Sequence, residues 1–177
     1  MAKRWLISLF LFVAGTLFVS AQEAEQPLKR AKVGDYAVFK TTGAGVTGTS
    51  KQEVIAVTEK EVTIRFTSTI NGMELPTTEQ KIDLTQKADP AVEAENRKKF
   101  KIVDTGKGQV TLKIDGKDYK CDWRSMTTTA TVNGMDYVTE SKLWMSKDAP
   151  VFGMIKSETK SFGQTTVVEL TESGSKK

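Results

Sequence analysis

The chain has 177 residues, a formal net charge of +4, no histidine and one cysteine, Cys121. The lack of histidine excludes Ser-His-Asp and Cys-His nucleophile systems, histidine general bases and histidine metal sites. A single cysteine excludes an intramolecular disulfide, so the folded domain depends on its core.

The N-terminus is typical of a secretory signal peptide. Met1 to Arg4 is short and basic, Trp5 to Val19 is apolar and uncharged, and small residues precede the polar segment that begins at Gln22. We predict a signal peptide at 1–21 with cleavage after Ala21, and hence a secreted or periplasmic protein. The alternative is a membrane anchor, but the apolar run of about 15 residues is shorter than the roughly 20 that span a bilayer. No cysteine lies near the cleavage site, which excludes a bacterial lipoprotein anchor.

The mature chain is nearly neutral, because the signal removes Lys3 and Arg4 and lowers the formal charge from +4 to +2. The basic precursor therefore gives no argument for nucleic acid as a partner. We expect a linker at 22–32, one domain at 33–172 and a flexible tail at 173–177, with no transmembrane anchor after cleavage.

A glycine-rich segment follows the first predicted strand, Gly34 to Lys40. Its residues Gly43, Gly45 and Gly48 match the G-x-G-x-x-G pattern of dinucleotide sites. That motif requires a helix to begin within it, whereas the β-branched residues of 51–57 predict a strand. We interpret the segment as a hairpin loop and predict no cofactor.

Hairpin turns recur along the rest of the chain. Asn71-Gly72, Asp115-Gly116 and Asn133-Gly134 favour tight turns, since these residues tolerate positive φ. The strand predicted from Met73 to Leu84 contains Pro76, which indicates an edge or a bulge. One helix is predicted near 89–99, where an Asp-Pro pair starts the segment and basic residues end it.

A strand, a knee and a returning strand are predicted from Val138 to Lys160. The knee, Ser146 to Gly153, contains an apolar cluster beside Trp144. Apolar side chains in a connection usually have something to cover. We expect this knee to cover the end of a sheet or a ligand.

About nine strands with short turns and one short helix indicate an all-β fold. We predict an antiparallel meander that forms a curved half-barrel or an up-and-down barrel, because hairpin follows hairpin without long crossovers. The alternative is a β-sandwich.

Hydroxyl side chains recur at alternate positions of the later strands. Two strands carry them on the faces of Leu143 and Ile155. These residues are Thr139, Ser141, Ser157, Thr159 and Ser161, and a further set runs from Ser125 in the register of Trp123. Packed side by side, these strands would give the sheet an aromatic end and a hydroxyl-lined end, which suits an amphiphile. The alternative is a solvent-exposed face, where threonine is a favoured strand residue.

The layout, with its strand–knee–strand from Trp144 to Glu158, resembles the LolA/LolB-like group of periplasmic lipoprotein carriers or a related exported bacterial β-protein family. In that group a half-barrel capped by helices holds acyl chains. The resemblance implies a carrier that holds an apolar chain against a curved sheet.

We therefore predict an exported, non-enzymatic binding or carrier protein for an apolar or amphiphilic ligand, with no metal site. The predicted ligand-binding residues are Tyr119, Trp123, Trp144, Phe152 and Met154. The alternative is a structural or protein-interaction module of the cell envelope, so the expected partner is a lipid, another amphiphile or an envelope protein. Cys121 alternates with Tyr119 and Trp123, so we expect it to lie in the core.

Overall fold

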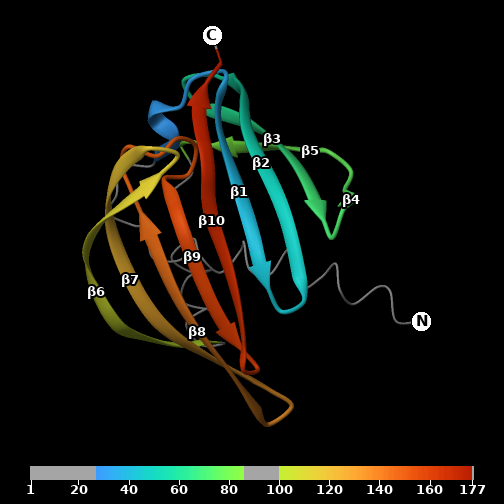
Figure 1. Cartoon of the computed structure of the whole chain (residues 1–177), viewed down its shortest axis with the longest axis vertical. Helices are drawn as coiled ribbons and strands as arrows, with labels where there is room; N and C mark the ends of the chain where they lie inside the picture. The colour runs from blue at the N-terminus through green and yellow to red at the C-terminus, as the bar shows by residue number, and fades with distance from the viewer. Residues whose placement is uncertain (1–26, 86–99, 177) are drawn as a thin grey trace.

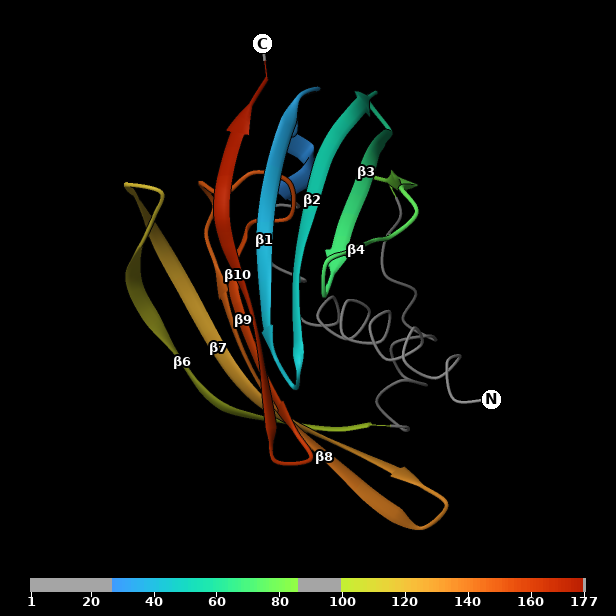
Figure 2. The ribbon, with the colours of Figure 1, turned by 45° about the vertical axis from the view of Figure 1, so that its right-hand side comes forward.

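The computed structural model describes residues 27–85 and 100–176. These residues form one 3-10 turn and a single antiparallel sheet of ten strands that curls without closing, as Figures 1 and 2 show. The elements are η1 (Pro27–Arg30), β1 (Asp35–Gly43), β2 (Val46–Val57), β3 (Glu61–Ile70), β4 (Met73–Glu74), β5 (Thr78–Asp83), β6 (Phe100–Ile114), β7 (Lys117–Val132), β8 (Met135–Met145), β9 (Met154–Ser161) and β10 (Gln164–Ser175). The predicted all-β, curved half-barrel is confirmed.

The strand order is β4-β3-β2-β1-β10-β9-β8-β7-β6, and β5 also pairs with β3. The first and last strands therefore lie side by side in the middle of the sheet. The prediction of a meander without long crossovers is wrong at one place, because the chain passes between opposite edges of the sheet from Asp83 to Phe100. The helix predicted near 89–99 falls outside the described residues.

The predicted turns are confirmed by backbone geometry. Asn71, Asp115 and Asn133 have φ of 49°, 48° and 52°, and a glycine with positive φ follows each. The glycine-rich segment is the β1–β2 hairpin, as predicted, and Gly48 lies within β2. Pro76 lies in the short break between β4 and β5 at the sheet edge.

Most of the core of β1–β3 and β10 lies on one face of the sheet, which we call the core face, while Tyr119, Cys121 and Trp144 are buried as well. Phe39 pairs with Leu170, and Val54 pairs with Ile64, so all four side chains share this face and all are buried. Leu28 of η1 is also buried, so part of the segment expected as a linker packs into the core.

The knee covers the core, as the apolar cluster predicts. Ala149 and Val151 are 6% and 2% exposed and belong to the same cluster as Phe39. The Ser146 amide donates to the Gly153 carbonyl at 2.8 Å and closes the knee. Val151 keeps a φ of 60°, which a β-branched residue adopts only when its packing holds it there.

The segment expected as a flexible tail at 173–177 differs from the prediction. Ser173 pairs with Ala37, β10 continues through Ser175, and the Lys176 amide donates to the Gly34 carbonyl at 2.9 Å. Polar composition predicted fraying, but a distant strand supplies the hydrogen-bond partners.

Charged side chains add a clamp across β1. Glu53 on β2 accepts hydrogen bonds from Lys51 at 2.9 Å and from Lys176 at 3.0 Å. Tyr36 donates its hydroxyl to Glu172 at 2.7 Å. The clamp therefore ties the end of β10 to β2.

We expect Ile64→Ala to lower the free energy of unfolding by about 2–5 kcal/mol, because a fully buried side chain leaves a cavity. Ile102→Ala is the matched control: its side chain is 44% exposed, and the expected loss is about 1 kcal/mol or less. Urea unfolding of both variants checks this. Equal losses would contradict the position of the core.

The clamp makes a second prediction. Hydrogen bonds from Lys51 and Lys176 hold the pKa of Glu53 below its ordinary value. The stabilisation is therefore complete above the ordinary pKa of glutamate, about 4.3, and is lost as pH falls through the lower folded-state pKa. In urea unfolding at a series of pH values, Glu53→Gln should reduce this loss of unfolding free energy at acid pH. Glu140 has an exposed carboxylate 3.7 Å from Lys160. Glu140→Gln is therefore the control, and it should leave the loss of unfolding free energy at acid pH unchanged.

Candidate functional site

Two of the predicted ligand residues are cross-strand neighbours that share one lysine. Trp123 on β7 lies directly opposite Trp144 on β8. The Lys142 ammonium lies 4.1 Å from the Trp123 ring centre and 4.8 Å from the Trp144 ring centre, within cation–π range. A Cβ added to Gly108 would stand 2.8 Å from Trp123 Nε1, so the indole lies against the bare backbone of β6. A glycine is needed there for this close approach.

The other predicted residues also belong to the packing. Tyr119 is 1% exposed, and its hydroxyl lies 2.7 Å from Ser173 Oγ on β10. Phe152 and Met154 are partly buried against the core cluster. The role of these five side chains in ligand binding stays a prediction.

Cys121 lies in the core, as predicted. Its side chain is 2% exposed, and its thiol donates to the Tyr119 carbonyl at 3.4 Å. Burial raises the pKa of this thiol above its ordinary value. The sulfur is therefore a small packed side chain and a poor nucleophile.

The hydroxyl side chains of β8 and β9 lie on the core face. Leu143 pairs with Ser157, which pairs with the core-face residue Val168 of β10. We call the set on this face the hydroxyl row: Thr139, Ser141, Ser157, Thr159 and Ser161. The hydroxyls of Thr139 and Ser161 are 3.5 Å apart.

The register separates the hydroxyl row from the tryptophans. Trp144 pairs with Lys156, whereas Ser157 is the next residue along and faces the other way. The structure therefore differs from the prediction of one surface with an aromatic end and a hydroxyl end. Trp144 and Thr139 occupy positions of opposite parity on one strand, and this parity is the sequence signal that indicates the separation.

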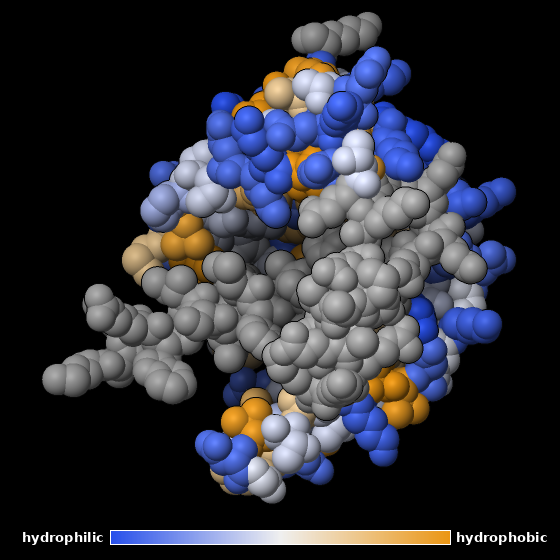
Figure 3. All heavy atoms as spheres, turned by 180° about the vertical axis from the view of Figure 1, so that it is seen from behind, coloured by the Kyte–Doolittle hydropathy of each residue, from blue (hydrophilic) through white to orange (hydrophobic). Residues whose placement is uncertain are grey.

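A different apolar surface adjoins the hydroxyl row. Val132 pairs with Met135, Ala130 pairs with Tyr137, and Thr128 pairs with both Ile102 and Thr139, which places these side chains on the core face. We call Ile102, Val132, Met135 and Tyr137 the apolar strip. The first three are 44%, 50% and 58% exposed. Figure 3 shows hydrophobic atoms at the lower end of the molecule, where Figure 1 places the β7–β8 hairpin.

Phe162 extends this apolar region at the β9–β10 turn. It is 78% exposed, and its ring meets Tyr137 edge-on with the ring centres 5.7 Å apart. Its φ is 53°, a conformation that a bulky side chain rarely adopts. Asn71, Asp115 and Asn133 occupy the equivalent position in three other turns.

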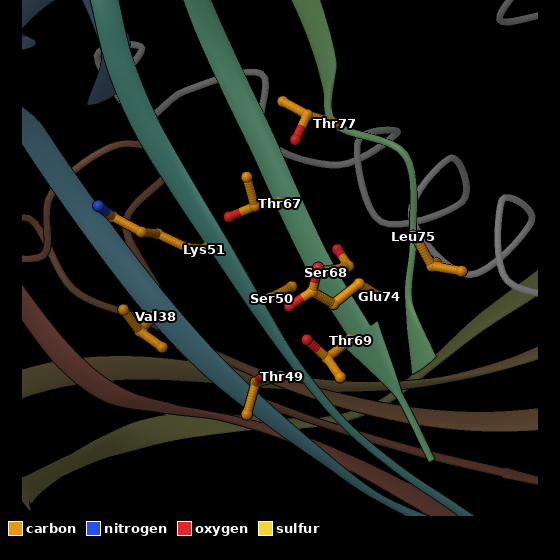
Figure 4. Close-up of a pocket in the computed structure, with 10 residues that line it drawn as sticks. All are labelled: Val38, Thr49, Ser50, Lys51, Thr67, Ser68, Thr69, Glu74, Leu75 and Thr77. Carbon is orange, nitrogen blue, oxygen red and sulfur yellow. The ribbon is translucent and has the colours of Figure 1, made fainter. Parts of the chain in front are cut away.

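A second concave site lies on the opposite face, between β1–β3 and the β4–β5 connection, and Figure 4 shows it. This open groove has a volume of about 330 Å³. Most of its lining side chains are hydroxyls, and none of the five predicted ligand residues is among them: Val38, Thr49, Ser50, Lys51, Thr67, Ser68, Thr69, Glu74, Leu75 and Thr77. Lys51 is already engaged by Glu53. Sequence reasoning missed this groove, because β4 and β5 form it by folding back beside β3.

Within 27–85 and 100–176, no three acidic or cysteine side chains come together as a metal site would require. Nor does that part of the chain contain a helix of the length and apolar character that spans a membrane.

No protein-family model matches the sequence, and no curated protein is similar to it in sequence. Solved structures align with most of this chain. A candidate exported protein with a YmcC-like fold from Bacteroides fragilis aligns with a TM-score of 0.55 and 9% identity, over 81% of this chain and 97% of that one. A candidate lipoprotein from Parabacteroides distasonis aligns with a TM-score of 0.49 and 12% identity, over 81% of this chain and 96% of that one. At 9% identity, the likeness to the Bacteroides fragilis structure shows the fold alone.

The turn at Phe162 yields a prediction. Phe162→Asn should raise the free energy of unfolding by about 1 kcal/mol, because asparagine tolerates positive φ far better than phenylalanine. Asn133→Phe is the reciprocal variant at a φ of 52° and should lower it by a similar amount. Thermal and urea unfolding measure both. A destabilised Phe162→Asn would mean that the ring contact with Tyr137 outweighs the strain.

Proposed function

We propose that this chain is an exported, non-enzymatic binding protein that holds an apolar or amphiphilic ligand on the core face of β6–β9. The observation that carries the proposal is the position of the apolar strip directly beside the hydroxyl row. Tyr137 and Thr139 are alternate residues of β8, so the strip passes into the row on one continuous face.

Three of the four side chains of the strip are exposed, although the same face is buried at β1–β3. Ile102, Val132 and Met135 are each more than two-fifths exposed, whereas Phe39 and Ile64 are 3% and 0% exposed. Grouped exposed apolar side chains mark places where something binds. A chain laid on the strip would place its polar end among the hydroxyls, which donate and accept hydrogen bonds.

Two further points support the proposal. The half-barrel layout is the one implied by the resemblance to periplasmic lipoprotein carriers. The similar structure from Bacteroides fragilis is described as a candidate exported protein, which agrees with the signal peptide expected at 1–21.

The test is native mass spectrometry of the mature protein from a periplasmic extract, followed by organic extraction and lipid analysis. We expect a bound adduct, and we expect Val132→Ser with Met135→Ser to weaken it about tenfold, since two apolar contacts are removed. Val138→Ser is a matched control: Val138 and Val132 are both 50% exposed, but Val138 lies on the opposite face of the same hairpin.

A bare mass, with no thermal shift on adding lipids, would overturn the proposal. A loss of binding in Val138→Ser equal to that in the double variant would overturn the choice of face. It would point instead to the hairpin tip, with Phe162 beside Val138, as the contact surface of an envelope interaction module.

A further inference from the structure

We infer that the ligand is an amphiphile with an uncharged polyol head group, such as a monoacylglycerol or a glycolipid, rather than a fatty acid or another anionic lipid. This inference rests on the proposed function and names the ligand class of the same site.

The first step is the distribution of charge between the two faces of β8 and β9. On the face opposite the core face, both strands carry charged side chains of both signs. These are Asp136, Glu140, Lys142, Lys156, Glu158 and Lys160. On the core face, the same two strands carry the hydroxyl row, Tyr137, Leu143 and Met135. All charge on these strands therefore lies on one side.

The second step concerns the neighbours of the row. The residues of β7 and β10 that pair directly with the row are all uncharged: Met126, Thr128, Gln164, Thr166 and Val168. The charged groups at the boundary belong to the next positions along β6 and β7, where Arg124 donates to both carboxylate oxygens of Asp104 at 2.6 and 2.5 Å.

The Arg124–Asp104 pair is satisfied within the protein. The hydrogen bonds from Arg124 hold the pKa of Asp104 below its ordinary value. Lys107, opposite Arg124 in the register, is exposed and lies beyond this pair. Among the described residues, no unpaired cation therefore stands within the row itself.

The third step is energetic. A carboxylate or phosphate placed among hydroxyls would lose water without gaining an opposite charge, and burial of an unpaired charge is costly. A hydroxyl or amide loses far less solvation free energy and can both donate and accept hydrogen bonds, and an ester can accept them. Charge complementarity thus selects a neutral head group.

The fourth step is size. Ser157 is 2% exposed, so the accessible part of the row is Thr139, Ser141, Thr159 and Ser161. These residues lie on two strands about 4.8 Å apart and extend about 7 Å along each strand. A carboxylate would meet one or two of these hydroxyls. A glycerol or sugar head group carries several hydroxyls at comparable spacing and can meet more of them at once.

The experiment compares two probes with the same acyl chain, 1-monopalmitoylglycerol and palmitate, added to the mature protein at pH 8 below their aggregation concentrations. Binding is followed by native mass spectrometry and by isothermal titration calorimetry. We expect monopalmitoylglycerol to bind at least about tenfold more tightly than palmitate. Dodecyl maltoside tests whether a sugar head group is accepted as well as glycerol.

Variants separate the head group from the chain. Thr159→Val keeps the side-chain shape and removes a hydroxyl of the row, so it should reduce the preference for monopalmitoylglycerol over palmitate severalfold. Thr127→Val is the matched control, since Thr127 is also half-buried on a strand but lies on the opposite face. Thermal unfolding confirms that both variants are folded.

The outcomes are distinguishable. If palmitate binds as tightly as monopalmitoylglycerol, the inference is overturned and the proposed function stands. If Thr159→Val leaves the preference for monopalmitoylglycerol unchanged, the hydroxyl row does not determine which head group binds, and the inference is overturned. If none of the probes binds, the proposed function itself fails.

Discussion

The pairing of β1 with β10 is the interaction on which the rest of the structure depends. It joins the strands β1–β5 to the strands β6–β10, and the chain places it between segments that are more than a hundred residues apart. Phe39 and Leu170 meet across this pair, and the clamp from Lys176 to Glu53 reaches over it. Without this pair, each half would have an additional unpaired edge strand. Such a non-local contact also predicts slow folding, because loop closure precedes its stabilisation.

The local features of this fold could be read from the sequence because they depend on neighbouring residues. Asn71, Asp115 and Asn133 precede glycine, and their positive φ follows from that chemistry alone. The knee contains an apolar cluster within a connection between strands. Val151 is buried because such a cluster is more stable when packed than when exposed to water.

The features that could not be read depend on pairing between distant segments. Ser173 has no local property that indicates Ala37 as its partner, so the polar C-terminus was predicted as a tail. The groove behind β3 arises where β4 and β5 fold back beside that strand. The candidate site lies between these cases: the alternation along β8 is local, but only the register shows that Met135 and Val132 meet on the face of the hydroxyl row.

The open half-barrel has a consequence for how a ligand would leave. A closed barrel buries its ligand on all sides, whereas a single curved sheet leaves one side of a bound chain accessible. Hydroxyls beside the apolar strip keep the empty surface wetted, which limits the exposed apolar area that could drive aggregation. The same hydroxyls can exchange ligand for water at little cost, because both make comparable hydrogen bonds. On the proposed function, affinity would rest on the few exposed apolar side chains of the strip, and such a site would suit transfer of a ligand better than its long retention.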